Sequence, residues 1–153
     1  MKLLIAIAAL LAPAAAMAAN SVTLESKAFV ERTTTDADGK TKVVLEDPKL
    51  VVPGDRLVFV LSYKNTGAQP AADFVVTNPI PQAVAYTGTE GSPAIVSVDG
   101  GKSWGPLASL KISQADGSLR DAQPADVTHV RWSFAKAIPA GQAGQLSFHG
   151  VVK

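Results

Sequence analysis

The sequence contains no cysteine, so no disulfide can brace the fold and the hydrophobic core alone must hold it together. A cysteine nucleophile and a lipid-modified N-terminal cysteine are excluded for the same reason. An excess of one charge is also missing, because 14 basic residues stand against 13 acidic ones and Lys2 belongs to the N-terminal leader described below. Nucleic acids and anionic membranes call for a clear basic excess, so we expect neither as a partner.

Catalytic and phosphate-binding motifs are absent as well. No serine lies in a Gly-x-Ser-x-Gly elbow, and no glycine-rich loop precedes a helical pattern. We therefore expect no enzymatic activity and no cofactor. Aromatic residues are few, and most of them fall at inward positions of the expected strands. This pattern leaves Tyr86 and Trp104 free to form a platform for a sugar ring, which makes them the candidate ligand-binding residues.

The long apolar run of the chain lies at its N-terminus and has the composition of an export signal. Lys2 supplies a basic region, Leu3 to Leu11 form an apolar region, and Ala16-Met17-Ala18 fits the small-x-small rule for signal peptidase. Residues 1–18 are therefore predicted to be a signal peptide, and residues 19–153 a single exported domain. An uncleaved anchor is the alternative, although the run is short for one. We expect a periplasmic or extracellular protein with no integral membrane segment after cleavage.

Short alternating segments separated by turn residues are what the chain has in abundance. The clearest runs from Pro53 to Gly67, where a Pro-Gly-Asp turn opens it and an Asn-Thr-Gly turn ends it. Between the turns, Leu57, Phe59, Leu61 and Tyr63 fall at every second position and so share one face of a strand. The middle of the other face is apolar too. This segment is predicted to be the central strand of a two-layer β protein.

Similar segments recur about every ten residues. Val22 to Glu46 predicts an N-terminal hairpin, with Asp38-Gly39 as the turn signal and Thr41 to Glu46 as the return strand. Leu50 to Val52 predicts a short edge segment. Ser113 to Asp126 is rich in turn residues and predicts an exposed loop. The remaining expected strands are 71–77, 83–87, 94–98, 103–107, 110–112, 127–134 and 145–152. We therefore predict an all-β, immunoglobulin-like antiparallel β-sandwich of about seven to nine strands, with residues 19–48 as hairpin and 50–153 as core.

Three segments in this order resemble one bacterial family. They are Val52-Pro53-Gly54-Asp55 leading into the central strand, Ala71 to Asn78 followed by Pro79-Ile80-Pro81, and Val130-Arg131-Trp132 followed by Ile138-Pro139-Ala140-Gly141. The set is similar to the "conserved repeat domain", the domain of unknown function numbered eleven. Asn78 stands where that family usually has aspartate, and Ile80-Pro81 replaces Leu-Pro. The resemblance covers about 50–153.

The resemblance implies an immunoglobulin-like fold in a surface or envelope protein. Members of that family usually occur in tandem arrays, as spacers or adhesive stalks, whereas this chain holds a single copy. A single module is more typical of an accessory or assembly component of the envelope. The Val22 to Glu46 hairpin lies outside the part of the chain that resembles the family.

Two patterns suggest metal sites. His129 and His149 are the only histidines, and a turn near Ala140 would place them opposite each other on the last two strands, so they are the candidate metal ligands. Two histidines without a nearby carboxylate make a poor site, and surface histidines are common. In the loop 113–126, Asp116, Asp121 and Asp126 can gather oxygens around calcium, or can simply be solvated.

Ser97 to Trp104 fits the Asp-box pattern Ser-x-Asp-x-Gly-x-Ser/Thr-Trp, a turn motif of sialidases and other β-propellers. Asp99 is expected to accept hydrogen bonds from turn amides, and Gly101 to take a positive φ. A propeller needs several such copies and a longer chain, so we interpret this one as a structural hairpin.

The sequence therefore favours a non-enzymatic structural or protein-interaction module of the cell envelope. Its partner is expected to be another envelope or surface protein, which an unpaired edge strand can bind. The hairpin and the Leu50 to Val52 segment are the expected contact region. A glycan-binding accessory module is the alternative hypothesis.

Overall fold

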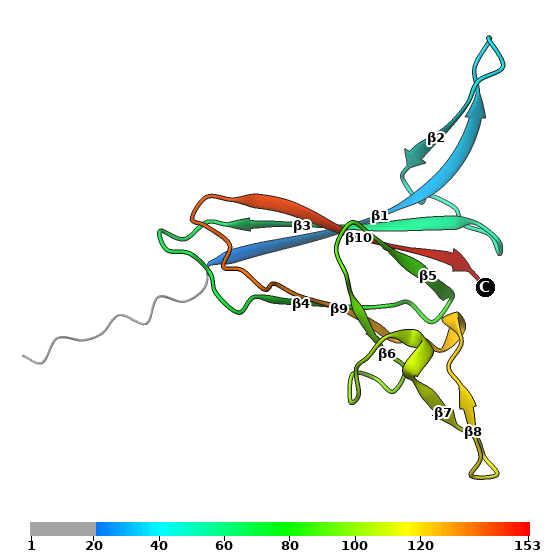
Figure 1. Ribbon diagram of the computed structural model, residues 1–153. Coiled ribbons are helices and arrows are strands. Elements are labelled where there is room, and N and C mark those ends of the chain that lie inside the picture. The colour runs from blue at the N-terminus through cyan, green and yellow to red at the C-terminus, as the bar shows by residue number, and fades with distance from the viewer. Residues whose placement is uncertain (1–20) are drawn as a thin grey trace, which may run out of the picture.

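The computed structural model describes residues 21–153, so the predicted signal peptide at 1–18 lies outside the described residues. Within residues 21–153 the chain forms β-strands and two one-turn 3-10 helices (Figure 1). The strands are β1 (Val22–Thr35), β2 (Thr41–Glu46), β3 (Arg56–Asn65), β4 (Val75–Pro79), β5 (Val84–Glu90), β6 (Ile95–Ser97), β7 (Lys111–Ser113), β8 (Leu119–Asp121), β9 (His129–Ser133) and β10 (Ala143–Val152). The 3-10 helices are η1 (Leu107–Ser109) and η2 (Pro124–Asp126).

Two antiparallel sheets pack face to face. The larger sheet has the strand order β2-β1-β3-β10-β5, and the smaller one has the order β4-β9-β6. Strands β7 and β8 form a separate hairpin that extends away from the smaller sheet (Figure 1). β3 lies in the middle of the larger sheet, as its apolar pattern predicts. The all-β antiparallel sandwich is thus confirmed.

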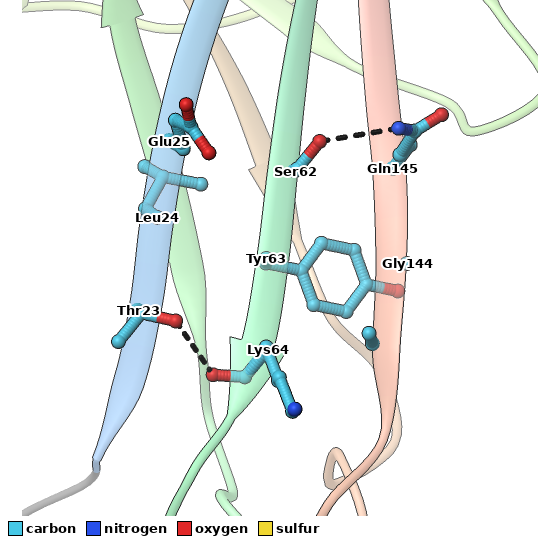
Figure 2. Close-up of a pocket in the computed structure, with 9 residues that line it drawn as sticks. Thr23, Leu24, Glu25, Ser62, Tyr63, Lys64, Gly144 and Gln145 are labelled. Atoms are coloured by element: carbon cyan, nitrogen blue, oxygen red, sulfur yellow. Dashed lines mark hydrogen bonds between the residues drawn. The ribbon is translucent and has the colours of Figure 1, made fainter.

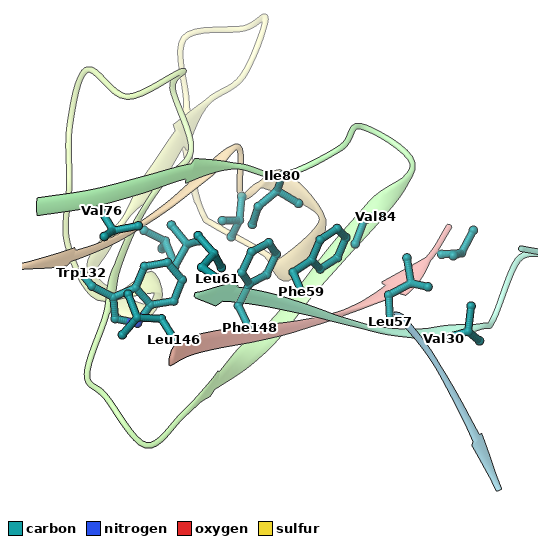
Figure 3. Close-up of a cluster of buried hydrophobic side chains, with 14 residues drawn as sticks. Val30, Leu57, Phe59, Leu61, Val76, Ile80, Val84, Trp132, Leu146 and Phe148 are labelled. Carbon is teal, nitrogen blue, oxygen red and sulfur yellow. The ribbon is translucent and has the colours of Figure 1, made fainter. Parts of the chain in front are cut away.

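The core lies between the two sheets and contains the alternating residues of their central strands (Figure 3). On the larger sheet, Phe59 of β3 stacks on Phe148 of β10, with ring centroids 4.5 Å apart and planes within 2° of parallel. Trp132 of β9 approaches Phe148 from the smaller sheet at 6.2 Å. Because aromatic rings bury large apolar areas, this contact makes a large contribution to sheet-on-sheet packing.

Asn65, the last residue of β3, joins two of the turns that the sequence pattern singles out. Its side chain is 1% exposed. The amide nitrogen donates to the carbonyl oxygens of Gln69 and Ile138, both at 2.8 Å, and the amide oxygen accepts from the Gly67 N–H at 3.0 Å. The Gly141 N–H also donates to the Asn65 carbonyl at 2.8 Å. The end of β3 is therefore fixed to the turn that leads into β10.

Three local predictions were wrong. Residues 50–52 form no strand. The Val52 N–H donates to the Asp55 carboxylate and the Val52 carbonyl accepts from the Asp55 N–H, so both backbone groups of Val52 are used within the turn. The predicted strand 103–107 is reduced to one bridge, between Val96 and Gly105, because Pro106 removes the next donor and η1 follows. The predicted loop 113–126 instead contains the end of β7, β8 and η2, in which Lys111 pairs with Asp121 across the hairpin.

Candidate interaction surface

The hairpin of β1 and β2 projects from the sandwich (Figure 1). β1 pairs with β3 from Val22 to Val30 and with β2 from Val30 to Thr35, so its second half has left the sandwich. At the tip, the Asp36 carboxylate accepts from the N–H groups of Asp38 at 3.1 Å and Lys40 at 2.8 Å. Gly39 has a φ of 78°, which few other residues adopt without strain. The Asp-Gly turn therefore forms where the sequence predicts it.

Exposed large apolar side chains gather on and just after this hairpin. Among residues 21–153, eight large hydrophobic residues are exposed, and five of them fall between positions 43 and 52. We call these five the exposed apolar segment; they are Val43, Leu45, Leu50, Val51 and Val52, and they are 40–77% exposed. Single exposed apolar residues are ordinary, but a concentration of this kind marks a surface suited to contact with another protein.

Asp55 fixes the end of the exposed apolar segment. Its carboxylate accepts two hydrogen bonds from the Arg32 guanidinium, at 2.6 and 3.3 Å, and one from the Val52 N–H at 3.0 Å. These donors, the Arg32 guanidinium first, hold the pKa of the Asp55 carboxyl below its ordinary value. Gly54 provides the required turn with a φ of 93°. The Pro-Gly-Asp turn thus ties the segment to the hairpin and to the start of β3.

A hollow of about 330 Å³ lies on the outer face of the larger sheet, beside the hairpin. Leu45 borders it, and Val58 forms part of its wall, only 5% exposed although it points away from the core. His149 lies between two carboxylates here, with Nδ1 3.2 Å from Glu31 Oε1 and Nε2 3.5 Å from Glu90 Oε1. Spacing cannot reveal this group, because its members come from β1, β5 and β10.

The two histidines do not meet, so the prediction that they face each other was wrong. β9, which holds His129, belongs to the smaller sheet, whereas β10, which holds His149, belongs to the larger one. The turn at 138–141 carries the chain from one sheet to the other, so both side chains lie on outer faces of opposite sides of the sandwich. His129 contacts Thr128 Oγ1 at 3.0 Å. In the described part of the chain, no group of three or more histidine, aspartate and glutamate side chains could hold a metal ion. The two glutamates beside His149 contact different ring nitrogens.

The Asp box folds as a compact turn, as expected. Asp99 accepts from the N–H groups of Lys102 and Ser103, at 3.0 and 2.9 Å, and from the Ser103 hydroxyl at 2.5 Å. These donors, the Ser103 hydroxyl first, hold the pKa of the Asp99 carboxyl well below its usual range. Gly101 has a φ of 91°, and the Gly101 carbonyl accepts from the Trp104 indole at 2.9 Å.

Tyr86 and Trp104 do not form a joint platform. Tyr86 pairs with Gly150 on the inner side of β5 and packs against the core, where burial raises the pKa of its hydroxyl. Trp104 lies on the outer face of the smaller sheet, where the Arg131 guanidinium covers its ring at 3.6 Å. The His129 ring approaches its edge at 6.2 Å. The geometry therefore places the two aromatic candidates on different parts of the sandwich.

The three aspartates of the 113–126 segment also remain apart. Asp116 accepts from the Ser118 N–H and hydroxyl at 2.9 and 2.6 Å, while Asp121 pairs with Lys111. Asp126 accepts from the Arg120 guanidinium through both oxygens, at 2.6 and 2.7 Å. Each carboxylate thus has its own local partner, and the three do not surround a common point.

A further hollow, of about 540 Å³, lies over the ends of β1, β3 and β10 (Figure 2). The Tyr63 ring lies across Gly144, where no side chain is present to displace it. Tyr63 also packs edge-on against Phe134 at 5.0 Å. Leu24 and Glu25 of β1 also line this hollow.

Comparisons with protein-family models, with curated proteins and with solved structures give no match for this chain. No helix within residues 21–153 has the length and apolar character that crossing a bilayer requires. The class of protein is therefore given by the fold alone, an antiparallel β-sandwich with a projecting hairpin.

Proposed function

We propose that this protein is an exported, non-enzymatic module of the bacterial cell envelope that binds another protein through hairpin β1–β2 and the exposed apolar segment. The observation that carries the proposal is the concentration of five exposed apolar side chains between positions 43 and 52. The composition of residues 1–18 supports export, and the resemblance of the Pro53 to Gly67 segment and its companions to the conserved repeat domain supports an envelope role.

Strand addition gives this surface a physical mechanism. β2 is the end strand of the larger sheet, so its outer backbone edge has no neighbour within the described residues. An extended segment of a partner can pair with that edge through backbone hydrogen bonds. Val43 and Leu45 lie two residues apart on one face of β2, where apolar side chains of the partner would cover them and supply apolar burial.

The non-enzymatic part of the proposal is supported by how the polar groups are used. The Asp99 carboxylate closes a turn, and the Asp126 carboxylate pairs with Arg120. The Asn65 amide joins two turns. These groups contribute to the fold through contacts that a substrate would have to displace.

Site-specific photo-crosslinking in the source cells tests the proposed surface. In one variant of the protein a photoreactive residue replaces Leu45. In a control variant it replaces Leu119, which is 65% exposed on β8 and far from the hairpin in sequence. We expect discrete crosslinked products from position 45 and none of the same mass from position 119. Equal products from both positions, or none from position 45, would refute the surface.

A second arm ties the products to the apolar contact. The variant Leu45→Lys, whose side chain is exposed and whose fold should therefore persist, is expected to lose the products when the photoreactive residue stands at Val43. Circular dichroism checks that the sheet content is unchanged. Mass spectrometry of the protein recovered from the same cells checks the predicted cleavage after Ala18.

A further inference from the structure

Within residues 21–153, the first half of β1 has an unpaired edge. Val22 to Phe29 pairs with β3 on one side, and β2 takes up the opposite side only from Val30 onward. The other end strands of the described sheets have shorter or interrupted edges, since β2 has six residues and β6 has three. β5 is interrupted by a bulge and by Gly88, and β4 ends in Pro79, which has no N–H to donate. The edge of β1 is therefore the longest regular one available for pairing.

The backbone groups that face this edge follow from one hydrogen bond. The Thr66 N–H, at the end of β3, donates to the Ser21 carbonyl at 2.8 Å, so Ser21 faces β3. In an antiparallel ladder alternate residues face the same side, and the N–H and C=O of Leu24, Ser26 and Ala28 therefore face outward. Val30 has the same parity and pairs with β2. Three consecutive outward positions are thus presented to a partner strand.

The charges on this edge are complementary to themselves. Glu25 and Lys27 flank Ser26 and lie on the same outer face, where their side chains pair with each other at 3.1 Å while 67% and 63% exposed. When a strand of identical sequence lies antiparallel with Ser26 opposite Ser26, each Glu25 lies opposite a Lys27. Leu24 then lies opposite Ala28. Two copies of the segment around Ser26 are therefore complementary in charge when they pair antiparallel.

We propose that a second copy of this chain pairs with the edge of β1, antiparallel and about a twofold axis through Ser26, and so joins the two larger sheets into one. The backbone N–H and C=O of Ser26 point toward this edge of β1, so the two Ser26 residues exchange both backbone hydrogen bonds. Glu25 and Lys27 fall at the non-hydrogen-bonded positions, where side chains across a ladder are closest. The isologous contact is closed, so it gives a dimer and no fibre.

The two adjacent registers of the same pairing are disfavoured by charge. A twofold axis through Glu25 sets Glu25 opposite Glu25, and one through Lys27 sets Lys27 opposite Lys27, and like charges directly opposite each other destabilise a sheet. The length of the ladder is limited as well. β2 already occupies the edge at Val30, so the shared ladder runs from Thr23 to Phe29.

Charge reversal tests the register. The dissociation constant of the dimer is measured by sedimentation equilibrium for the wild type, Glu25→Lys, Lys27→Glu and the double variant. Each single reversal sets two like-charged pairs across the axis and is expected to raise the dissociation constant about tenfold or more. The double reversal restores two opposite pairs and is expected to return the constant to near the wild-type value. A wild type that stays monomeric at about 1 mM overturns the proposal. So do single reversals without effect, or a double reversal that is as weak as the singles.

The cysteine-free chain permits a second, geometric test. Opposite residues of a hydrogen-bonded antiparallel pair have Cα atoms about 5.5 Å apart, within the range that a disulfide spans. Ser26→Cys is therefore expected to oxidise to a covalent dimer much faster than Glu25→Cys, whose thiols are not opposite each other. Equal rates, or no covalent dimer from Ser26→Cys, would contradict the twofold axis at Ser26.

The dimer and the proposed envelope partner use different surfaces, so the failure of one proposal can be distinguished from the failure of the other. Leu45→Lys is expected to leave the dissociation constant of the dimer unchanged, because Leu45 lies on β2 and outside the Thr23 to Phe29 ladder. If Leu45→Lys dissociates the dimer while the charge reversals do not, the copies associate through the hairpin and the edge proposal fails.

Discussion

The orientation of the Asn65 amide predicts how the fold responds to two substitutions at that position. In the native structure its nitrogen donates to two carbonyl oxygens and its oxygen accepts one N–H, all within a site where the side chain is 1% exposed. Asn65→Ala removes all three bonds and leaves the Ile138 carbonyl and its neighbours without this partner. A buried group left unpaired costs about 1–3 kcal/mol, so we expect a loss of about 2–4 kcal/mol in the free energy of unfolding.

Asn65→Asp has nearly the same shape but replaces the donor with an acceptor. The introduced carboxyl faces two carbonyl oxygens that lie 2.8 Å from the present nitrogen, and its negative charge is buried. Burial and the carbonyls favour the protonated form, so its folded-state pKa lies above the unfolded value of about 3.9. The sign is therefore fixed: the variant loses stability as pH rises from about 4 through the folded-state pKa, by ~1.4 kcal/mol for each unit of difference.

Urea unfolding followed by tryptophan fluorescence provides the measurement. The gap in free energy of unfolding between Asn65→Ala and Asn65→Asp is expected to shift against the aspartate variant by about 2 kcal/mol between pH 4 and pH 7. Asn78→Asp is the control, because the Asn78 amide makes one exposed hydrogen bond, to the Pro79 carbonyl, and the change there should stay within about 0.5 kcal/mol. An aspartate variant at position 65 that is as stable as the wild type at pH 7 would refute the assigned hydrogen bonds.

Three further outcomes are expected. The stability advantage of the wild type over Asp99→Asn should be constant above about pH 5 and should shrink as pH falls below about 4, because the pKa of the Asp99 carboxyl is lowered in the fold; thermal unfolding across pH checks it. Gly150→Ala should cost about 1–3 kcal/mol in urea unfolding, since the added Cβ would overlap the Val84 side chain. Phe148→Ala should cost about 3–5 kcal/mol in the same assay by removing the ring that stacks on Phe59.

The parts of the fold that the sequence predicts are those set by local pattern. The period of two from Leu57 to Leu61 correctly predicts β3 and its buried face, because one face of a central strand must be covered. The Asp-Gly turn predicts hairpin β1–β2 and the start of β2 at Thr41, since Gly39 can adopt the positive φ that the turn needs. The exposure of Leu50 to Val52 also agrees with a contact surface.

What local pattern cannot supply is the assignment of strands to sheets. Both strands alternate apolar and polar residues, with Val130 and Trp132 inward in β9 and Phe148 inward in β10. This alternation does not indicate that β9 and β10 lie in different sheets. The histidine prediction failed on this point alone. The group of His149, Glu31 and Glu90 was missed for the converse reason, because three strands far apart in sequence bring it together across the outer face.

The division of β1 into two halves lets both proposed contacts exist at once. Its first half, up to Phe29, belongs to the sandwich and has an edge that no other described strand covers, whereas its second half, from Val30, belongs to the hairpin. A twofold axis at Ser26 runs the two β1 strands in opposite directions, so the two hairpins lie at opposite ends of the joined sheet. A dimer formed this way leaves both copies of the exposed apolar segment accessible. It therefore presents two binding surfaces, and a partner that holds two target segments would bind it with an affinity raised by the effective concentration of the second site.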